Sequence, residues 1–245
     1  MFEAIGIRKT FYARTANEVR ALQGVDLRIE EGSFVIIIGT NGSGSPRFST
    51  PRLDRSSSMR GGCVWPGATS RPGLSIVGPG SWDGFSRIPT AARRRTSQRQ
   101  QLREKVNRLN MGLEDRLDNP IGNLSGGQRQ ALTLLMATWR RPDLLLLDEH
   151  TAALDPKSAD QVIRLTEQVV SEHGLTTLMV THSMQQAVSL GDRLIMMYRG
   201  RIIHDFAGAM KRRLRVHDLL ERFEEVRRGE QLDETVAELL QRSYV

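Results

Sequence analysis

The run Leu124-Ser125-Gly126-Gly127-Gln128 is followed further along the chain by Leu144-Leu145-Leu146-Leu147-Asp148-Glu149. The first run predicts a Ser-Gly-Gly turn that opens a helical stretch from Arg129 to Arg140. Two glycines let backbone N–H groups approach an anion closely, and the start of a helix adds partial positive charge at the same place. The first run therefore predicts an anion-binding helix start.

The four leucines of the second run predict a strand that is buried on both faces. This strand ends in two adjacent carboxylates, Asp148 and Glu149. The first carboxylate can hold Mg²⁺, and the second can orient or deprotonate a water molecule.

Three further stretches complete an ordered set of motifs. Phe34–Ile38 predicts a buried strand that runs into the glycine-rich loop Gly39–Gly44, Ala153-Leu154-Asp155 follows the carboxylates, and Val180-Thr181-His182 closes another buried strand. The whole set resembles the ATP-binding subunits of ABC transporters, with their phosphate loop, signature, Walker B strand, D-loop and switch histidine. The resemblance covers residues 1–44 and 96–245.

The resemblance implies a nucleotide site that uses ATP and Mg²⁺. Its catalytic residues would be Glu149 and His182, and its metal ligand would be Asp148. In the family, an aromatic side chain stacks on adenine, glycine-loop amides bind phosphates, and the signature closes over the γ-phosphate held by the opposite subunit. The matching nucleotide-binding positions are Phe11, Gly39, Asn41, Gly42, Ser43, Gly44, Ser125, Gly126, Gly127, Gln128 and Asp155.

The resemblance also implies partners. A head-to-tail dimer, either a homodimer or a pair with another ABC ATPase subunit, would share two ATP sites. A membrane permease would bind it at the cytoplasmic face, and a solute-binding protein would take part indirectly. The single cassette without a fused membrane domain is similar to importers of small solutes. No nucleic acid is expected, and an ABC protein that acts on nucleic acid or the ribosome is the weakest rival because such proteins carry two cassettes.

The phosphate loop departs from the family pattern in its last two positions. The family has Lys and then Ser or Thr after the final glycine, whereas this chain has Ser45 and Pro46. The lysine reaches the β- and γ-phosphates and the hydroxyl binds Mg²⁺, so both the charge and the metal ligand are missing. We expect ATP hydrolysis to be impaired, which leaves a non-catalytic subunit as an alternative.

Residues 45–95 have an unusual composition. They carry nine arginines, no lysine, two aspartates and no glutamate, so the net charge of this segment is +7. The net charge of the whole chain is also +7, so the charges of the other residues sum to zero. The segment shows neither helical nor alternating periodicity, and one interpretation is a disordered insertion. An arginine-rich arm for nucleic acid is a weaker interpretation, because lysine and regularly interleaved aromatic residues are missing.

A third interpretation is that residues 45 to about 90 are a frameshifted translation. In one alternative reading frame, Gly44–Pro51 can encode Lys-Ser-Thr-Leu-Leu-Asn-Ala, which supplies the missing end of the phosphate loop. In the same frame, Ser58–Pro66 can encode Asp-Ala-Gly-Arg-Val-Arg-Leu-Ala. Trp82–Pro89 can encode Gly-Arg-Val-Phe-Gln-Asp-Pro, which resembles the glutamine loop of the family. Three family motifs in order in one frame favour this hypothesis.

The remaining features predict one α/β domain over residues 1–245. We expect the P-loop NTPase-like fold of ABC ATPases, with a mostly parallel sheet, an antiparallel β edge from strands at 3–8 and 22–29, a helical subdomain at 96–140 and a helical tail at 207–245. Residues 96–118 are predicted to be helical. The single cysteine favours a reducing compartment, and no apolar run is long enough to span a bilayer.

Overall fold

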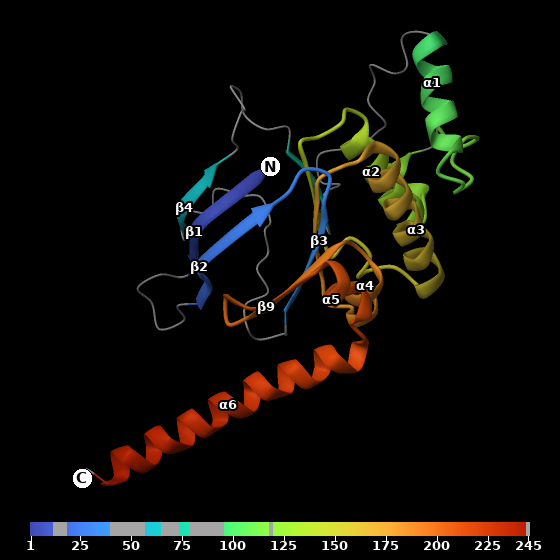
Figure 1. Ribbon diagram of the computed structural model, residues 1–245. Coiled ribbons are helices and arrows are strands. Elements are labelled where there is room, and N and C mark those ends of the chain that lie inside the picture. Colours follow the sequence, from blue (N-terminus) through green and yellow to red (C-terminus); the bar gives the residue numbers. More distant parts are fainter. Residues whose placement is uncertain (12–18, 40–56, 65–73, 79–95, 118–119, 244–245) are drawn as a thin grey trace.

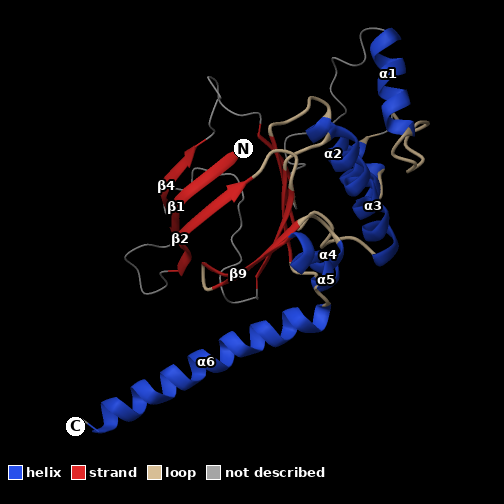
Figure 2. Ribbon diagram, viewed as in Figure 1, coloured by secondary structure: helices blue, strands red, loops and turns tan. Residues whose placement is uncertain are grey.

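The computed structural model describes residues 1–11, 19–39, 57–64, 74–78, 96–117 and 120–243 (Figure 1). Within these residues, nine strands form two sheets, and several of the helices lie against one of the sheets (Figure 2). The strands are β1 (Phe2–Phe11), β2 (Val19–Ile29), β3 (Phe34–Gly39), β4 (Ser57–Val64), β5 (Leu74–Val77), β6 (Leu144–Asp148), β7 (Thr177–Thr181), β8 (Arg193–Tyr198) and β9 (Arg201–Ala207).

The larger sheet has six strands in the order β5-β6-β7-β3-β8-β9. All its neighbouring strands are parallel except β8 and β9, which form an antiparallel pair. The smaller sheet has the order β2-β1-β4 and is antiparallel. The predicted α/β fold with a mostly parallel sheet is therefore confirmed, and the predicted antiparallel N-terminal edge forms a separate three-stranded sheet.

The helices follow the strands in chain order. Their bounds are α1 (Thr96–Asn107), the short 3-10 helix Ile121–Asn123, α2 (Gly126–Thr138), α3 (Pro156–His173), α4 (Met184–Ser189), α5 (Gly208–Arg213) and α6 (Val216–Ser243). Helices α2, α3 and α4 cover one side of the larger sheet, whereas the smaller sheet lies on the other side (Figure 1). Helix α6 begins against this body, where Leu219 and Phe223 are buried in the core, and its later turns extend away from it (Figure 1).

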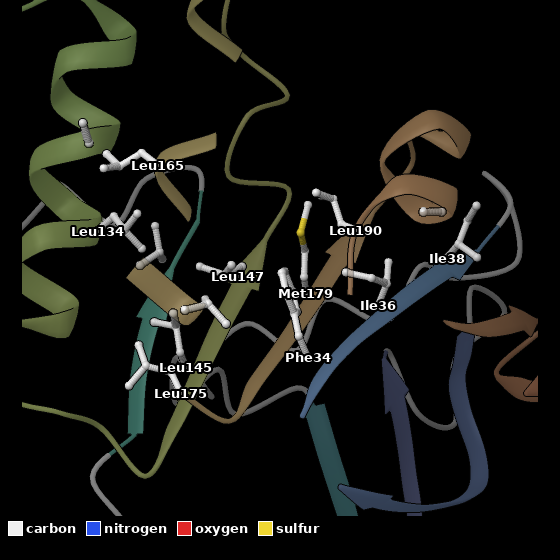
Figure 3. Close-up of a cluster of buried hydrophobic side chains, with 14 of the residues drawn as sticks. Phe34, Ile36, Ile38, Leu134, Leu145, Leu147, Leu165, Leu175, Met179 and Leu190 are labelled. Carbon is white, nitrogen blue, oxygen red and sulfur yellow. The ribbon is translucent and has the colours of Figure 1, made fainter. Parts of the chain in front are cut away.

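Alternate side chains of β3 explain this layered arrangement. Phe34, Ile36 and Ile38 belong to the cluster that packs under the helices (Figure 3). Val35 and Ile37 belong to a second cluster, which includes buried residues of β1 and β2. All five side chains are buried, because successive residues of a strand point to opposite faces and both faces are covered here.

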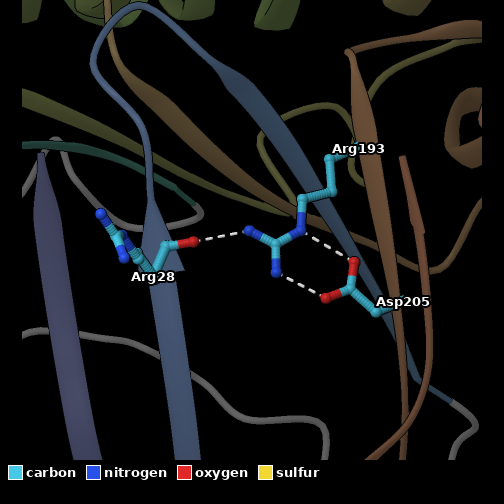
Figure 4. A network of polar contacts seen from close by, with 3 residues as sticks. All are labelled: Arg28, Arg193 and Asp205. Atoms are coloured by element: carbon cyan, nitrogen blue, oxygen red, sulfur yellow. Dashed lines mark hydrogen bonds and ion pairs between the residues drawn. The ribbon is translucent and has the colours of Figure 1, made fainter. Parts of the chain in front are cut away.

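A salt bridge on β8 ties the two sheets together (Figure 4). The Arg193 guanidinium donates Nε and Nη2 to the two carboxylate oxygens of Asp205, with the Nε contact at 2.8 Å, and it donates Nη1 to the Arg28 carbonyl on β2. A two-point Arg–carboxylate contact fixes the direction of the side chain as well as its distance. Arg193 therefore fixes the edge strand β9 and the strand β2 of the other sheet in one arrangement.

Three predicted elements need correction. The helix predicted over 96–118 ends at Asn107, because Asn110 and Gly112 adopt positive φ angles that turn the chain. The predicted C-terminal helical tail is divided between α5 and α6 at Leu214 and Arg215. The interpretation of residues 45–95 as a disordered insertion is wrong for Ser57–Val64 and Leu74–Val77, which form β4 and β5 by pairing with β1 and β6.

We predict that Gly191→Ala lowers the free energy of unfolding by more than about 2 kcal/mol. Gly191 has φ +69, and a Cβ there would lie 2.5 Å from the Phe34 carbonyl oxygen. Phe34 belongs to the central strand β3, so this carbonyl cannot shift to make room. Urea denaturation followed by circular dichroism measures the change. The control is Gly229→Ala in α6, where a Cβ meets open space and a gain of about 0.5–1 kcal/mol is expected. Equal effects of the two changes would contradict the argument.

Candidate active site at the ends of three parallel strands

The candidate site lies where β6, β7 and β3 end side by side. These strands are parallel neighbours, with Asp148 opposite Val180 and Ile38 opposite Thr181. Their carboxyl ends therefore meet at one edge of the sheet, the usual place for ligands in open α/β sheets. This edge brings together the end of the phosphate-loop strand at Gly39, the predicted carboxylates and the predicted switch histidine.

Glu149 and His182 contact each other directly at this edge. Glu149 Oε1 lies 2.6 Å from His182 Nε2, and the two side chains are 24% and 34% exposed. Glu149 has φ 44, an unfavourable backbone angle for a residue with a side chain, while its N–H still donates to the Val180 carbonyl at 3.0 Å. The hydrogen bond from the Glu149 N–H holds this strained backbone, which places the Glu149 carboxylate beside the His182 imidazole. Such a pair can orient water and accept its proton.

A short network holds the strand ends that carry this pair. Gln186 of α4 accepts from the Thr181 hydroxyl at 2.7 Å and donates Nε2 to the Thr151 hydroxyl at 3.2 Å. Ser183 caps α4 and accepts from the Gln186 N–H. Gln186 therefore joins the loop after β6 to the end of β7. No local motif marks Gln186, because its partners come from the loop after β6 and from the end of β7.

The predicted signature forms a well-capped helix start. The Ser125 hydroxyl accepts from the Gln128 N–H at 3.2 Å, and the Gln128 side chain accepts from the Ser125 N–H at 3.1 Å. Gln128 also donates to the Met111 carbonyl. Ser125 is the N-cap residue of α2. This reciprocal capping box satisfies two donors at the start of α2.

The signature glycines have a packing role that the sequence did not indicate. A Cβ at Gly126 would lie 2.9 Å from Leu154 Cδ2, and one at Gly127 would lie 2.9 Å from Ser158 Cβ. The Gly127 position therefore needs glycine so that α2 can approach the start of α3, whereas the Leu154 side chain can move away from a Cβ at Gly126. This packing joins the signature to the predicted D-loop within one subunit.

Asp155 caps α3 in this structure. Its carboxylate accepts from the Ser158 N–H at 3.0 Å, and Pro156 follows in the first turn. Hydrogen bonding to Ser158 lowers the pKa of the Asp155 carboxyl, so it carries a negative charge at the helix start. Its contact with nucleotide, which the resemblance implies, stays a prediction.

Asp148 ends β6 beside the last described residue of the β5 segment. A Cβ at Gly78 would lie 3.0 Å from the Asp148 carbonyl oxygen and 3.3 Å from its Cβ, so this close approach needs glycine. Carboxylate oxygens are the donors that Mg²⁺ prefers, and Mg²⁺ in nucleotide sites binds one or two carboxylates with the substrate phosphates. The carboxylate of Asp148 is a donor of this kind, and its role as the Mg²⁺ ligand stays a prediction.

The remaining predicted residues belong to the nucleotide loop and the adenine contact. Gly39 is the last residue of β3, and Phe11 is the last residue of β1, where it pairs with Val19 and Ser57. The other loop positions lie outside the described residues, as do Ser45, Pro46 and the predicted glutamine loop; these loop positions are Asn41, Gly42, Ser43 and Gly44.

His150, which directly follows the two carboxylates, is a core residue. It is 4% exposed, and its Nε2 lies 3.2 Å from the Thr166 hydroxyl. That hydroxyl donates its proton to the Val162 carbonyl at 2.8 Å, so Nε2 is the protonated nitrogen of a neutral ring. Burial lowers the pKa of His150 from 6.5 to about 4. These contacts support a packing role rather than proton transfer at the site.

We predict that His150 makes the fold acid-sensitive between pH 6.5 and 4. Its pKa is lower in the folded chain, so the unfolded chain binds more protons and stability falls as the pH falls through this window. Unfolding in urea should show a loss of about 2 kcal/mol between pH 7.5 and 5. His150→Leu should flatten this dependence, whereas His173→Gln on the surface should leave it unchanged. An unchanged slope in His150→Leu would disprove the assignment.

Comparison with known proteins identifies the class that this α/β fold and its strand-end residues define. The ABC transporter family model matches residues 53–152. The tyrosine transport ATP-binding protein of Clostridioides difficile is 33% identical over 256 residues, which cover 91% of this chain and 99% of that protein. The lipoprotein-releasing system ATP-binding protein LolD 1 of Caulobacter vibrioides is 32% identical over 225 residues, which cover 79% and 91%.

Solved structures agree with these sequence relatives. A dimeric structure of a post-hydrolysis state of an ATP-binding cassette, bound to ADP and Pi, superposes with a TM-score of 0.64 and 25% identity. The superposition covers 84% of this chain and 98% of that one. The chain belongs to the ABC transporter family, as one of its ATP-binding proteins. Among the described residues, no helix is long and apolar enough to cross a membrane.

Proposed function

We propose that the protein is the ATP-binding subunit of an ABC transporter for the uptake of a small solute, with an ATP-hydrolysing site whose activity is impaired by Ser45 and Pro46. The observation that carries this proposal is the contact between Glu149 and His182, beside the strand that ends at Gly39. A base, an imidazole and a phosphate-loop strand at one sheet edge are the parts that phosphoryl transfer to water requires.

Within this site each residue has a distinct task. Glu149 orients the attacking water and accepts its proton, and His182 contacts the γ-phosphate while holding the Glu149 carboxylate in place. Asp148, with the substrate phosphates, would hold Mg²⁺, and that ion would offset negative charge on the phosphates. The backbone amides of the glycine-rich loop bind phosphate, and Phe11 stacks on the adenine.

The working form is a head-to-tail dimer. The capped signature, Ser125–Gln128, of one subunit closes over the γ-phosphate held by the other, and Asp155 lies near the shared nucleotide. The dimeric state of the similar cassette with ADP and Pi supports this arrangement. The cap at Ser125 and the packing of Gly126 and Gly127 support it as well, because they fix the signature as a rigid surface.

The dimer would act on a membrane permease at the cytoplasmic face, with a solute-binding protein as an indirect partner. Relatives support an importer of small solutes. They are named for tyrosine transport, aliphatic sulfonate import and bicarbonate transport. The chain spans about a third of the length of the bicarbonate relative, so the other two carry more weight.

The chain with Ser45 and Pro46 is an impaired ATPase in this proposal. A lysine that offsets the developing phosphate charge stabilises the transition state by several kcal/mol in comparable charged clamps. Its replacement by Ser45 removes that charge, and Pro46 removes the hydroxyl that binds Mg²⁺. These two residues also favour a second candidate, a non-catalytic subunit that dimerises through its signature while a working partner hydrolyses ATP.

We predict that the purified chain shows no ATP hydrolysis above background, and that Ser45→Lys with Pro46→Ser tightens ATP binding by at least about tenfold. The restored cation and hydroxyl would contact the phosphates and Mg²⁺. Binding is measured by calorimetry with ATP and Mg²⁺, and hydrolysis by phosphate release.

The control adds Glu149→Gln to the double variant. It removes the base and keeps the shape of the side chain, so ATP binding should persist while any regained hydrolysis falls at least about a hundredfold. A clear ATPase rate from the unaltered chain would contradict the proposed impairment. Hydrolysis that survives Glu149→Gln would contradict the role of Glu149.

We further propose that residues 45 to about 90 are a frameshifted translation, and we predict the outcome of sequencing codons 44–96 on both strands from a fresh template. The expected result is one open frame with Lys-Ser-Thr after Gly44 and a glutamine in Phe-Gln-Asp-Pro. That result makes the cellular protein an ordinary transport ATPase. If the DNA encodes Ser45, Pro46 and the arginine-rich run, the frameshift is rejected and the gene is damaged or repurposed.

A further inference from the structure

A basic groove lies between α4 and the junction of α5 with α6. Its volume is about 660 Å³, within the range of pockets that hold small ligands. One wall comes from α4 and the other from the chain around the α5–α6 break. The lining residues are Gln185, Val188, Ser189, Arg212, Arg213, Leu214, Arg215 and Val216.

Three arginines give this groove its charge. Arg212, Arg213 and Arg215 are exposed, and the described part of the structure gives none of their guanidinium groups an ion pair. The nearest acid in sequence, Asp218, is engaged elsewhere: it accepts from the Arg215 backbone N–H at 2.7 Å and lies 3.1 Å from His217 Nε2. The stretch 211–216 beside the groove therefore has a surplus of positive charge.

Lys211 fixes the two walls of the groove against each other. It is 3% exposed, and its ammonium donates to the Val188 carbonyl near the end of α4. Burial lowers the pKa of Lys211, and the charge of Asp192 opposes that shift. A buried lysine in this contact is costly to displace, so the arginines stand on a fixed framework rather than on a loose tail.

We propose that this groove is a binding site for a phosphate-bearing anion. Guanidinium groups match phosphate oxygens in two-point hydrogen bonds, and several of them together favour a group with more than one negative charge. The side-chain amide of Gln185 adds a polar donor, while Val188, Leu214 and Val216 supply apolar surface. A free polyphosphate and the headgroup of an anionic lipid share this chemistry.

The groove is joined to the candidate active site by one short helix. Helix α4 begins after His182, its Gln186 bonds both Thr181 and Thr151, and its far end lines the groove. A ligand in the groove would contact the C-terminal end of α4. The same helix holds the end of β7 and the loop after β6 through Gln186. Occupancy of the groove therefore regulates the Glu149–His182 pair, a consequence that rests on the proposed function, whereas the binding itself does not.

Calorimetry with pyrophosphate, without metal ions, tests the binding. We predict that Arg212→Ala with Arg213→Ala weakens pyrophosphate binding by at least about tenfold. The matched control, Arg140→Ala with Arg164→Ala, removes two exposed arginines elsewhere and should change binding less than about threefold. Arg212→Lys with Arg213→Lys keeps the charge and should give an intermediate loss, which keeps the test valid if the alanine variant fails to fold.

Vesicle binding separates the two sources of phosphate. Vesicles of phosphatidylcholine with and without phosphatidylglycerol are sedimented with the chain and with each variant. Loss of both pyrophosphate and vesicle binding in the groove variant assigns a lipid headgroup as a ligand, and loss of pyrophosphate binding alone assigns a free anion. Unchanged pyrophosphate binding in the groove variant, or equal losses in the control, would overturn the site.

Nuclear magnetic resonance of the histidine rings tests the coupling. Pyrophosphate should shift the His182 signal, assigned with His182→Gln, and leave the His173 signal in place. The groove variant should abolish the shift, and Gln186→Leu should abolish it while pyrophosphate still binds. An unmoved His182 signal with intact binding rejects the coupling alone, and ATP binding by the Ser45→Lys, Pro46→Ser chain judges the proposed function separately.

Discussion

The parallel pairing of β7 with both β6 and β3 is the constraint on which the site depends. Because the three strands run in the same direction, their carboxyl ends meet at one edge, and the register sets Asp148 opposite Val180. A slip of one residue would exchange the side chains that a strand gives to the two apolar clusters, which their close packing opposes. The 2.6 Å contact of Glu149 with His182 is thus a consequence of core packing.

The sequence predicted this sheet well because strands covered on both faces leave continuous apolar runs. Phe34–Ile38 and the leucines before Asp148 were placed within one residue of β3 and β6. The ends of helices were predicted poorly where the apolar spacing continues past the residue at which the helix stops. The apolar spacing beyond Asn107 suggested more helix, but positive φ angles end it, and the α5–α6 break carries no Gly or Pro signal. Strand β5 forms by pairing with the open edge of β6, and its own sequence did not predict it.

The residues that meet at the candidate site could be predicted from the sequence, but the residues that hold them in place could not. Glu149 and His182 stand in local motifs, so sequence was enough to pair them. Gln186 contacts the end of β7 and the loop after β6, and only the tertiary fold brings these two segments to it. Gly126 and Gly127 were explained by anion contact, and the structure adds their close approach to α3. A glycine pair can thus serve packing and ligand at once, and sequence alone does not separate the two roles.

Folding and catalysis depend on different parts of this chain. Within residues 45–95, Val77 is the one core side chain among those described, whereas the clusters on both faces of the larger sheet come from elsewhere. The same segment would supply the lysine, the metal-binding hydroxyl and the glutamine on which hydrolysis depends. A lesion there removes the phosphate chemistry and leaves most of the packing intact. The chain can therefore keep the fold, the capped signature and the strand-end pair of an ABC ATPase whether or not it still turns over ATP.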